Sequence, residues 1–327
     1  MTSLGIDLGG TKLSLAVFST EGQINEKQTV PISKKGGEEV GKLMLEEMQQ
    51  MIAKHPSIRS IGIAVPGIYR SKTGTVWAPN INGWDDYPLL EHMRAAVDVP
   101  VVIDSDRAAY ILGESWMGNA KGCGNAIYLA VGTGIGAGIL IDGEVLRGAH
   151  DIAGAIGWLA LKPPFEPKYS SCGCFEYHAS GDGIARVARE VLSTNNSYDG
   201  ILKQKNPKEL TSHDVFAAYE SGDELAKEVF SVCIQFWGMA VANLVSLFNP
   251  EKIILGGGVF GPAVQFIPAI ADEAKKWAQP ISITKVSVEQ SSLGADAGLY
   301  GAAFLAHLAV KKPAVQGEFE HRRKIQE

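Results

Sequence analysis

Residues 3–18 read SLGIDLGGTKLSLAVF and decide the fold of this chain. The pattern predicts an apolar strand, a glycine turn at 7–12 and a second strand over 13–18. Residues 126–140, AIYLAVGTGIGAGIL, repeat it with a strand over 127–131, a turn at 132–136 and a strand over 137–140. Glycines let the backbone approach a phosphate, and turn amides point inward as donors. The repeated hairpin predicts a phosphate clamp between two duplicated lobes.

Glycine-rich hairpins are also ordinary turns, so a third segment is needed to choose between the two interpretations. Residues 252–258, KIILGGG, form another apolar run that enters glycines. Three such transitions, two of them with a threonine (Thr11 and Thr133), favour a nucleotide site. A dinucleotide-binding fingerprint must open a helix, whereas residues 132–138 continue into a strand. The sequence also lacks a Gly-Lys-Ser/Thr phosphate loop.

Composition limits the class of protein. The 327 residues are 46% hydrophobic and 20% charged, which predicts a globular chain of two ordinary domains. The net charge of −6, with scattered basic residues, argues against nucleic acid as a partner. The N-terminus has no leader pattern and charges interrupt the apolar runs, so we expect a cytoplasmic protein with no membrane partner. The four cysteines are too few for a disulfide scaffold and indicate reduced thiols or a metal site.

The motifs together resemble the sugar kinases of the repressor, open-reading-frame and kinase (ROK) family, within the actin-like, hexokinase-like ATPase superfamily. Residues 7–12 resemble the first phosphate loop of that family, 131–136 the second, and 248–258 the adenosine-side motif. The resemblance extends to about residue 308. It implies a two-lobed α/β actin-like ATPase (ribonuclease H-like) fold with a central cleft. We expect a smaller N-terminal lobe of 1–118 plus about 301–327, and a larger C-terminal lobe of 119–300.

The resemblance also implies ATP and Mg²⁺ as cofactors and assigns residues to them. Asp7 would hold a metal-bound water. The implied cofactor-binding residues are Asp7, Gly9, Gly10, Thr11, Lys12, Gly132, Thr133, Gly134, Gly256, Gly257 and Gly258.

The catalytic aspartate of the family lies eight residues before the glutamate of a Gly-Glu pair. From Glu114 this spacing selects Asp106, while Ser105 and Ala108 replace two family asparagines. A carboxylate after a buried strand can accept a proton from an attacking hydroxyl. A helix N-cap is the plainer role for Asp106, and the two roles are compatible. Asp104 is a rival base by chemistry, but its spacing disfavours it.

The resemblance implies a sugar site, and three departures alter it. Ala155 stands where the family has a sugar-binding glutamate, Trp158 where it has a histidine, and Ser105 where it has an asparagine. We therefore expect a substrate other than plain glucose, with less hydrogen-bonding demand or more apolar surface. The implied substrate-binding residues are Gly67, Asn80, Asn82, Ser105, Asp106, Trp158 and Glu176.

The zinc motif of the family is reduced here to Cys172 and Cys174. A tetrahedral site would need His150 or His178 as a further ligand, so zinc binding is doubtful.

These observations predict an ATP-dependent kinase that phosphorylates a hydroxyl of a hexose or hexose derivative, a small-molecule sugar or polyol. Two alternatives stay open: a non-catalytic sugar or nucleotide sensor, and a kinase for a cyclitol or glycoside. The resemblance further implies a homodimer.

Overall fold

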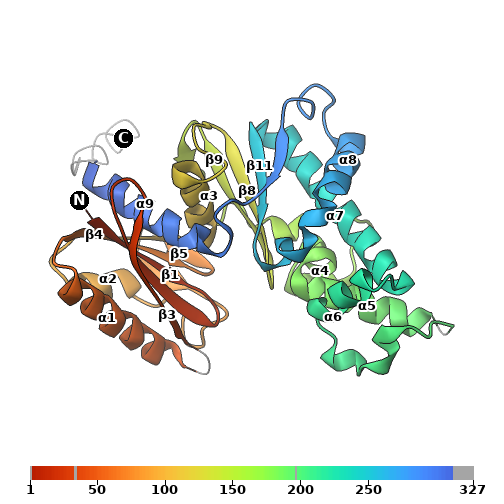
Figure 1. The fold of residues 1–327 in the computed structure, drawn as a ribbon, viewed down its shortest axis with the longest axis horizontal. Helices are drawn as coiled ribbons and strands as arrows, with labels where there is room; N and C mark the ends of the chain where they lie inside the picture. Colours follow the sequence, from red (N-terminus) through yellow and green to blue (C-terminus); the bar gives the residue numbers. More distant parts are fainter. Residues whose placement is uncertain (1, 33–34, 196, 312–327) are drawn as a thin grey trace, which may run out of the picture. The chain divides into compact units, whose positions relative to one another are not determined.

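The computed structural model describes residues 2–32, 35–195 and 197–311, so the stretch 312–327 of the expected N-terminal lobe lies outside it (Figure 1). The chain divides into two compact units. Unit 1 comprises Met1–Trp116 with Gly298–Glu327, and unit 2 comprises Met117–Ala297.

Unit 1 is built on a sheet with the strand order β3-β2-β1-β4-β7. Strands β1, β4 and β7 run parallel, whereas β2 and β3 are antiparallel additions. Its strands are β1 (Thr2–Leu8), β2 (Lys12–Phe18), β3 (Ile24–Pro31), β4 (Ile58–Val65), β5 (Ile68–Arg70), β6 (Thr75–Trp77) and β7 (Val101–Ser105). Its helices are α1 (Gly37–Lys54), α2 (Leu89–Ala95), α3 (Asp106–Met117) and α9 (Ala297–Lys311), the last two reaching one residue past the boundary of the unit.

Successive side chains along the central strands point to opposite faces of this sheet. Leu4, Ile6 and Ile63 join the apolar core that also contains the buried methionines of α1. The intervening positions, Gly5 and Gly62, are small because helix α9 lies against them. A Cβ at Gly62 would be 1.8 Å from the carbonyl oxygen of Ala302. Glycine at these positions therefore lets α9 lie directly on the strands.

Unit 2 contains a second sheet with the order β10-β9-β8-β11-β12, in which β8, β11 and β12 are parallel. Its strands are β8 (Ala126–Val131), β9 (Ile135–Ile141), β10 (Glu144–Val145), β11 (Lys252–Gly256) and β12 (Ser287–Gln290). Its helices are α4 (Cys174–Ala179), α5 (Gly181–Thr194), α6 (Ser212–Glu220), α7 (Glu224–Phe248) and α8 (Ile267–Trp277).

Helix α7 is the central helix of unit 2. By length and composition it could cross a membrane, but 61% of its most apolar window is buried inside the protein. Its side chains pack with those of α4, α5 and α6 and of strands β8 and β11 in one apolar cluster. This burial is the pattern of a core helix.

The elements follow the sequence pattern closely, with instructive differences. The glycine turn of the second hairpin is shorter than predicted, because Ile135 already pairs with Val131 in β9. Strand β7 begins at Val101, directly after Pro100, which has no N–H for the ladder. Strand β3 was not predicted. It is an edge strand whose residues alternate between half-buried and exposed, a weak signal in sequence.

The contact between Gly62 and α9 gives a stability prediction. Gly62→Ala should lower the stability of unit 1 by about 3 kcal/mol or more, because the new methyl group meets helix backbone that cannot rotate away. Gly36→Ala is the control, since the nearest atom to its added Cβ is a flexible Glu39 oxygen at 3.8 Å. Thermal unfolding measures both. A melting temperature for Gly62→Ala equal to that of Gly36→Ala would contradict the packing.

Candidate functional site: two strand edges and a nucleotide-sized cavity

The glycine motifs of unit 2 meet at one edge of its sheet. Strands β8 and β11 are parallel and pair Ala130 with Gly256, so both chains leave the sheet side by side. Gly257 has φ +87°, and a Cβ there would lie 2.4 Å from the carbonyl oxygen of Val131. A side chain at this position would be strained by its backbone and would clash. The turn before Gly258 thus lies directly against the second phosphate loop.

Helix α5 begins at the same edge. The Ser180 hydroxyl accepts the N–H of Gly183 as an N-cap, and the Gly181 N–H donates to the carbonyl oxygen of Gly132 at 2.7 Å. The positive end of the helix dipole therefore lies beside the loop that carries Thr133. Helix N-termini and glycine turns both favour anionic ligands, phosphate among them.

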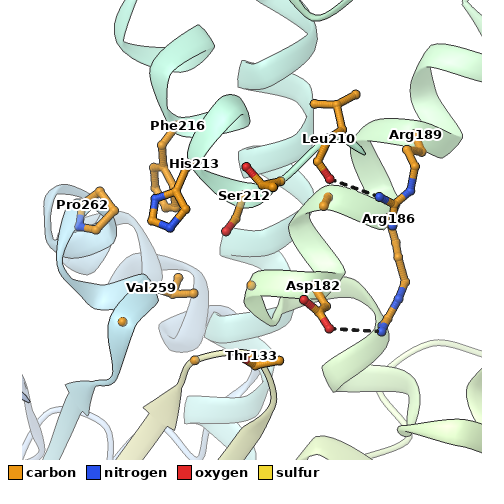
Figure 2. A pocket seen from close by; sticks show the side chains of 15 residues that line it. Thr133, Asp182, Arg186, Arg189, Leu210, Ser212, His213, Phe216, Val259 and Pro262 are labelled. Carbon is orange, nitrogen blue, oxygen red and sulfur yellow. Dashed lines mark hydrogen bonds and ion pairs between the residues drawn. The ribbon is translucent and has the colours of Figure 1, made fainter. Parts of the chain in front are cut away.

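A cavity of about 580 Å³ opens at this edge (Figure 2). This volume falls within the range of about 300–1,000 Å³ that is usual for small-molecule sites. Of the predicted residues it brings together Gly132, Thr133 and Gly258. Added Cβ atoms at Gly132 and Gly258 would meet nothing within 4 Å, so the backbone leaves room for a ligand at both. The donors, the helix end and the volume fit a nucleotide.

Most of the cavity wall was missed by the sequence reasoning. Figure 2 shows a polar wall from α5 and, across the cavity, a mixed wall in which Ser212 and His213 of α6 lie near Phe216 and Pro262. The missed lining residues are Gly181, Asp182, Ala185, Arg186, Arg189, Leu210, Thr211, Ser212, His213, Phe216, Val259 and Pro262. One signal was available: residues 182, 186 and 189 are polar at helical spacing, opposite the buried Ile184, Val187 and Ala188.

Glu176 lies at the other side of the second phosphate loop. Its Oε2 atom accepts the N–H of Ile135 at 2.7 Å, and burial raises the pKa of this carboxyl above its ordinary range. Added Cβ atoms at Gly134 and Gly157 would come within 2.8 and 2.9 Å of the same oxygen. The loop and the segment around Gly157 thus form a niche that only glycines leave open for this side chain.

Trp158 follows this niche and is 58% exposed. It ends the 3-10 helix η1 (Ile156–Trp158), whose backbone packs against Gly173 at the start of α4. Ala155 precedes η1 and is partly buried. The exposed Trp158 indole and the Glu176 carboxylate thus offer a ligand an apolar surface and a hydrogen-bond acceptor.

In unit 1 the parallel strands also end at one edge. Asp106 is the first residue of α3, directly after β7, and is half-buried. Burial raises its pKa to about 6, although the neighbouring Arg107 guanidinium and the bond from the Arg107 N–H to Oδ1, at 2.7 Å, oppose the rise. A carboxyl with this pKa can take up and release a proton near neutral pH.

The hydroxyl of Ser105, and not the carboxylate of Asp106, accepts the Ala108 N–H, at 3.3 Å. This bond has the geometry of a helix N-cap. Asp104 is buried within β7, where its Oδ1 accepts the Ser105 N–H. Arg107 donates to the carbonyl oxygen of Gly67 at 3.1 Å, which ties this predicted substrate residue to the start of α3.

The first phosphate loop follows β1 at this edge. Its turn is closed by the bond from the Gly9 N–H to the Lys12 carbonyl oxygen, and Thr11 is exposed. A Cβ added at Gly10 would lie 3.9 Å from the Asn80 side chain, so this predicted substrate residue is next to the loop. Asn82 is exposed in the same turn as Asn80, and its carbonyl oxygen accepts the Gly37 N–H.

Asp7 is the penultimate residue of β1 and lies against the start of α9. A Cβ at Gly298, in the first turn of that helix, would be 2.5 Å from an Asp7 carboxylate oxygen. The helix dipole there favours the charged carboxylate, whose oxygens are the ligand type that Mg²⁺ prefers.

The predicted zinc residues do not form a metal site. Among residues 2–32, 35–195 and 197–311, no three His, Cys, Asp or Glu side chains are grouped as metal ligands would be. His178 is buried against Phe236, and its Nδ1 atom bonds to the carbonyl oxygen of Cys174. His150 is exposed. The residues present therefore do not fit zinc.

Comparison with known proteins supplies the family. The family model described as "ROK family" matches residues 3–309. The chain belongs to the ROK family. A glucokinase of Halalkalibacterium halodurans is 32% identical over 310 residues, covering 92% of this chain and 94% of that protein. A beta-glucoside kinase of Listeria monocytogenes is 27% identical over 305 residues, 93% and 97% of the two chains.

A solved structure extends the likeness to three dimensions. The ROK family glucokinase of Streptomyces griseus, in complex with glucose and AMPPNP, superposes with a TM-score of 0.76. It is 28% identical, and the match covers 94% of this chain and all of that one. The predicted α/β actin-like ATPase fold is confirmed by this match.

The niche around Glu176 gives a second prediction. Burial raises the pKa of Glu176, so at a pH above the ordinary carboxyl pKa the charged form lowers the free energy of unfolding. This destabilisation disappears when the carboxyl is protonated. Glu176→Gln keeps an acceptor for the Ile135 N–H and should raise the melting temperature near neutral pH by about 1–4 °C.

This gain should shrink as the pH falls from neutral toward the ordinary carboxyl pKa, because the raised pKa of the native carboxyl lets it become neutral before an ordinary carboxyl does. Thermal unfolding across this range measures it. The exposed Glu209→Gln is the control and should show no such trend. A loss of stability in Glu176→Gln that is equal at every pH would contradict the assigned cause.

Proposed function

We propose that this ROK protein is an ATP-dependent carbohydrate kinase that phosphorylates a hydroxyl of a hexose derivative. The observation that carries the proposal is Asp106, a half-buried carboxyl with a pKa of about 6 at the carboxyl end of β7. A general base works best when its pKa lies near the working pH. The relatives named glucokinase and beta-glucoside kinase, and the relative that binds AMPPNP, support the same reaction.

In this mechanism Asp106 accepts the proton of the substrate hydroxyl as its oxygen attacks the γ-phosphorus. The new oxygen–phosphorus bond forms while the bond to the β-phosphate oxygen breaks, and ADP leaves with that electron pair. Oδ1 of Asp106 already accepts the Arg107 N–H, so Oδ2 takes the proton. Arg107 in turn is fixed by the Gly67 carbonyl oxygen, which holds the base in position.

Each of the two glycine loops, Gly9–Lys12 in unit 1 and Gly132–Gly134 in unit 2, offers backbone and hydroxyl donors suited to phosphate. Thr133 and the first turn of α5 supply donors and the positive helix end in unit 2. Mg²⁺ supplies charge neutralisation at the phosphates when it is bound, and Asp7 would hold it through water.

The substrate pocket favours a modified hexose over glucose. The Ser105 hydroxyl accepts a bond from its own helix, and Ala155 has no polar side-chain atom. In unit 2, Glu176 keeps one strong acceptor and the exposed Trp158 adds an indole. In unit 1, Asn80 and Asn82 keep polar side chains. A substituent on the sugar, as in a glycoside, would pack on that indole. A free hydroxyl at the same place would find no hydrogen-bond partner.

The homodimer implied by the family resemblance and the cytoplasmic location expected from the sequence pattern both stay predictions.

Asp106→Asn tests the base. Turnover should fall about 100-fold or more, since the amide cannot take the proton, while ADP binding persists. In the native enzyme kcat/KM should decline below pH about 6, because the base is then protonated. A coupled ADP-release assay over sugars, amino sugars, glycosides and inositols measures both.

Asp98→Asn, an exposed carboxylate of the same unit, is the control and should behave as the native enzyme. Native turnover in Asp106→Asn would overturn the assignment. Binding of sugar and nucleotide without turnover of any acceptor would instead indicate the non-catalytic sensor.

The altered pocket gives a prediction on specificity. Trp158→His combined with Ala155→Glu should raise kcat/KM for glucose relative to a β-glucoside by about 10-fold or more, because two lost polar contacts are each worth about 1–3 kcal/mol. Trp277→His replaces a tryptophan of similar exposure on α8 and should leave the ratio unchanged. If the native protein phosphorylated glucose as efficiently as every other sugar tested, the predicted preference for a modified hexose would be wrong.

A further inference from the structure

The cavity of unit 2 has a polar and an apolar end. Thr133 and Gly181 mark one end, where the glycine loop and the start of α5 favour phosphate. Another part of the wall carries the apolar side chains of Phe216, Val259 and Pro262, beside the polar Ser212 and His213. In Figure 2 Thr133 lies at the bottom of the view and Phe216 and Pro262 lie toward the top left. A phosphate group and an aromatic base match these two parts.

Asp182 is the feature that this division does not explain. Its carboxylate lines the cavity on the α5 wall, in the first turn of the helix and close to the phosphate end. A carboxylate is an acceptor without a proton to donate near neutral pH, so it repels phosphate oxygens and gains nothing from an apolar base face. Its side chain is 60% exposed, so a ligand can reach it. Its carboxylate is available to accept hydrogen bonds from a ligand group that donates them.

Arg186 excludes a divalent cation as that partner. Its guanidinium lies 3.9 Å from the Asp182 carboxylate and is held in place by Cys172 Sγ at 3.5 Å and by the face of Tyr177. A fixed positive charge at this distance opposes Mg²⁺ on the same carboxylate. The donors that a nucleotide carries between its phosphates and its base are the ribose hydroxyls.

We infer that Asp182 accepts hydrogen bonds from the ribose hydroxyls of the nucleotide, so that a ribonucleotide is preferred over a deoxyribonucleotide or an inorganic polyphosphate as phosphoryl donor. The inference rests on the proposed function, because it assigns a specificity role within the same nucleotide site. A hydrogen bond to a charged acceptor is stronger than a neutral one, so loss of the hydroxyl should cost about 10-fold in affinity or more.

The test compares ligands that differ only at the ribose. Isothermal titration of the full-length protein gives dissociation constants for ADP, 2′-deoxy-ADP and tripolyphosphate, in the native protein and in Asp182→Ala and Asp182→Asn. The native protein should bind ADP about 10-fold or more tighter than 2′-deoxy-ADP. Asp182→Ala should reduce this ratio to about 1, with Asp182→Asn between, while tripolyphosphate affinity does not weaken.

Asp199→Ala is the matched control. Asp199 is an exposed carboxylate of unit 2 that pairs with Lys203 at 3.7 Å in the same i,i+4 arrangement as Asp182 with Arg186. It should keep the native ratio. Any general effect of the lost charge on phosphate binding changes the dissociation constants of ADP and 2′-deoxy-ADP alike, so it cancels in their ratio within one variant.

Three results would overturn the inference. An unchanged ADP to 2′-deoxy-ADP ratio in Asp182→Ala, with ADP binding and sugar phosphorylation retained, overturns the ribose contact and leaves the proposed function standing. An equal loss for both nucleotides that added Mg²⁺ restores would make Asp182 a metal-site residue instead. Failure of the native protein to bind ADP at all would remove the nucleotide site, and the proposed function would fail with it.

Discussion

Parallel strand pairing is the constraint on which both candidate sites depend. In unit 1 the register pairs Asp7 with Ala64 and Ala64 with Asp104, so β1, β4 and β7 end at one edge. In unit 2 the pairing of β8 with β11 does the same for two glycine turns. Parallel strands leave their sheet at the same edge, and ligands bind outside the carboxyl ends of such strands. Segments far apart in the sequence therefore supply one site edge in each unit.

Close backbone approach is the second requirement, and glycine meets it in both units. Gly5 and Gly62 let α9 lie against the sheet of unit 1, and this brings the first turn of α9 to the Asp7 carboxylate. Gly134 and Gly157 leave space for the Glu176 carboxylate in unit 2. The same residue type thus serves packing at one place and a polar side chain at another. Sequence alone does not distinguish these uses, because the neighbours that would clash come from distant segments.

The two carboxyls of the proposed reaction are both held in surroundings that raise their pKa. Burial raises that of Asp106 and that of Glu176, while a backbone N–H bonds to each and limits the rise. A desolvated carboxylate costs folding stability near neutral pH, and it is a stronger base and acceptor for the same reason.

The sequence by itself determined the duplicated hairpin, the family and the α/β fold, because strand periodicity, glycine turns and motif spacing are local properties. It also singled out Asp106 from its spacing to Glu114, though not the pKa of about 6, which comes from the protein packed around it. The sequence predicted the nucleotide loops at Gly132 and Gly258, but it did not predict the other residues that line the cavity beside them.

The tertiary structure decided that wall. Asp182 and Arg186 come from α5 and Phe216 from α6. Helical spacing marks the polar face of α5, but nothing in the linear order shows that α6 lines the same cavity. The structure likewise showed that the Ser105 hydroxyl caps α3 and that His178 packs on Phe236 instead of joining the two cysteines. A side chain's partners depend on which distant segments fold against it, and that information lies in the packing of the whole unit rather than in any short stretch of sequence.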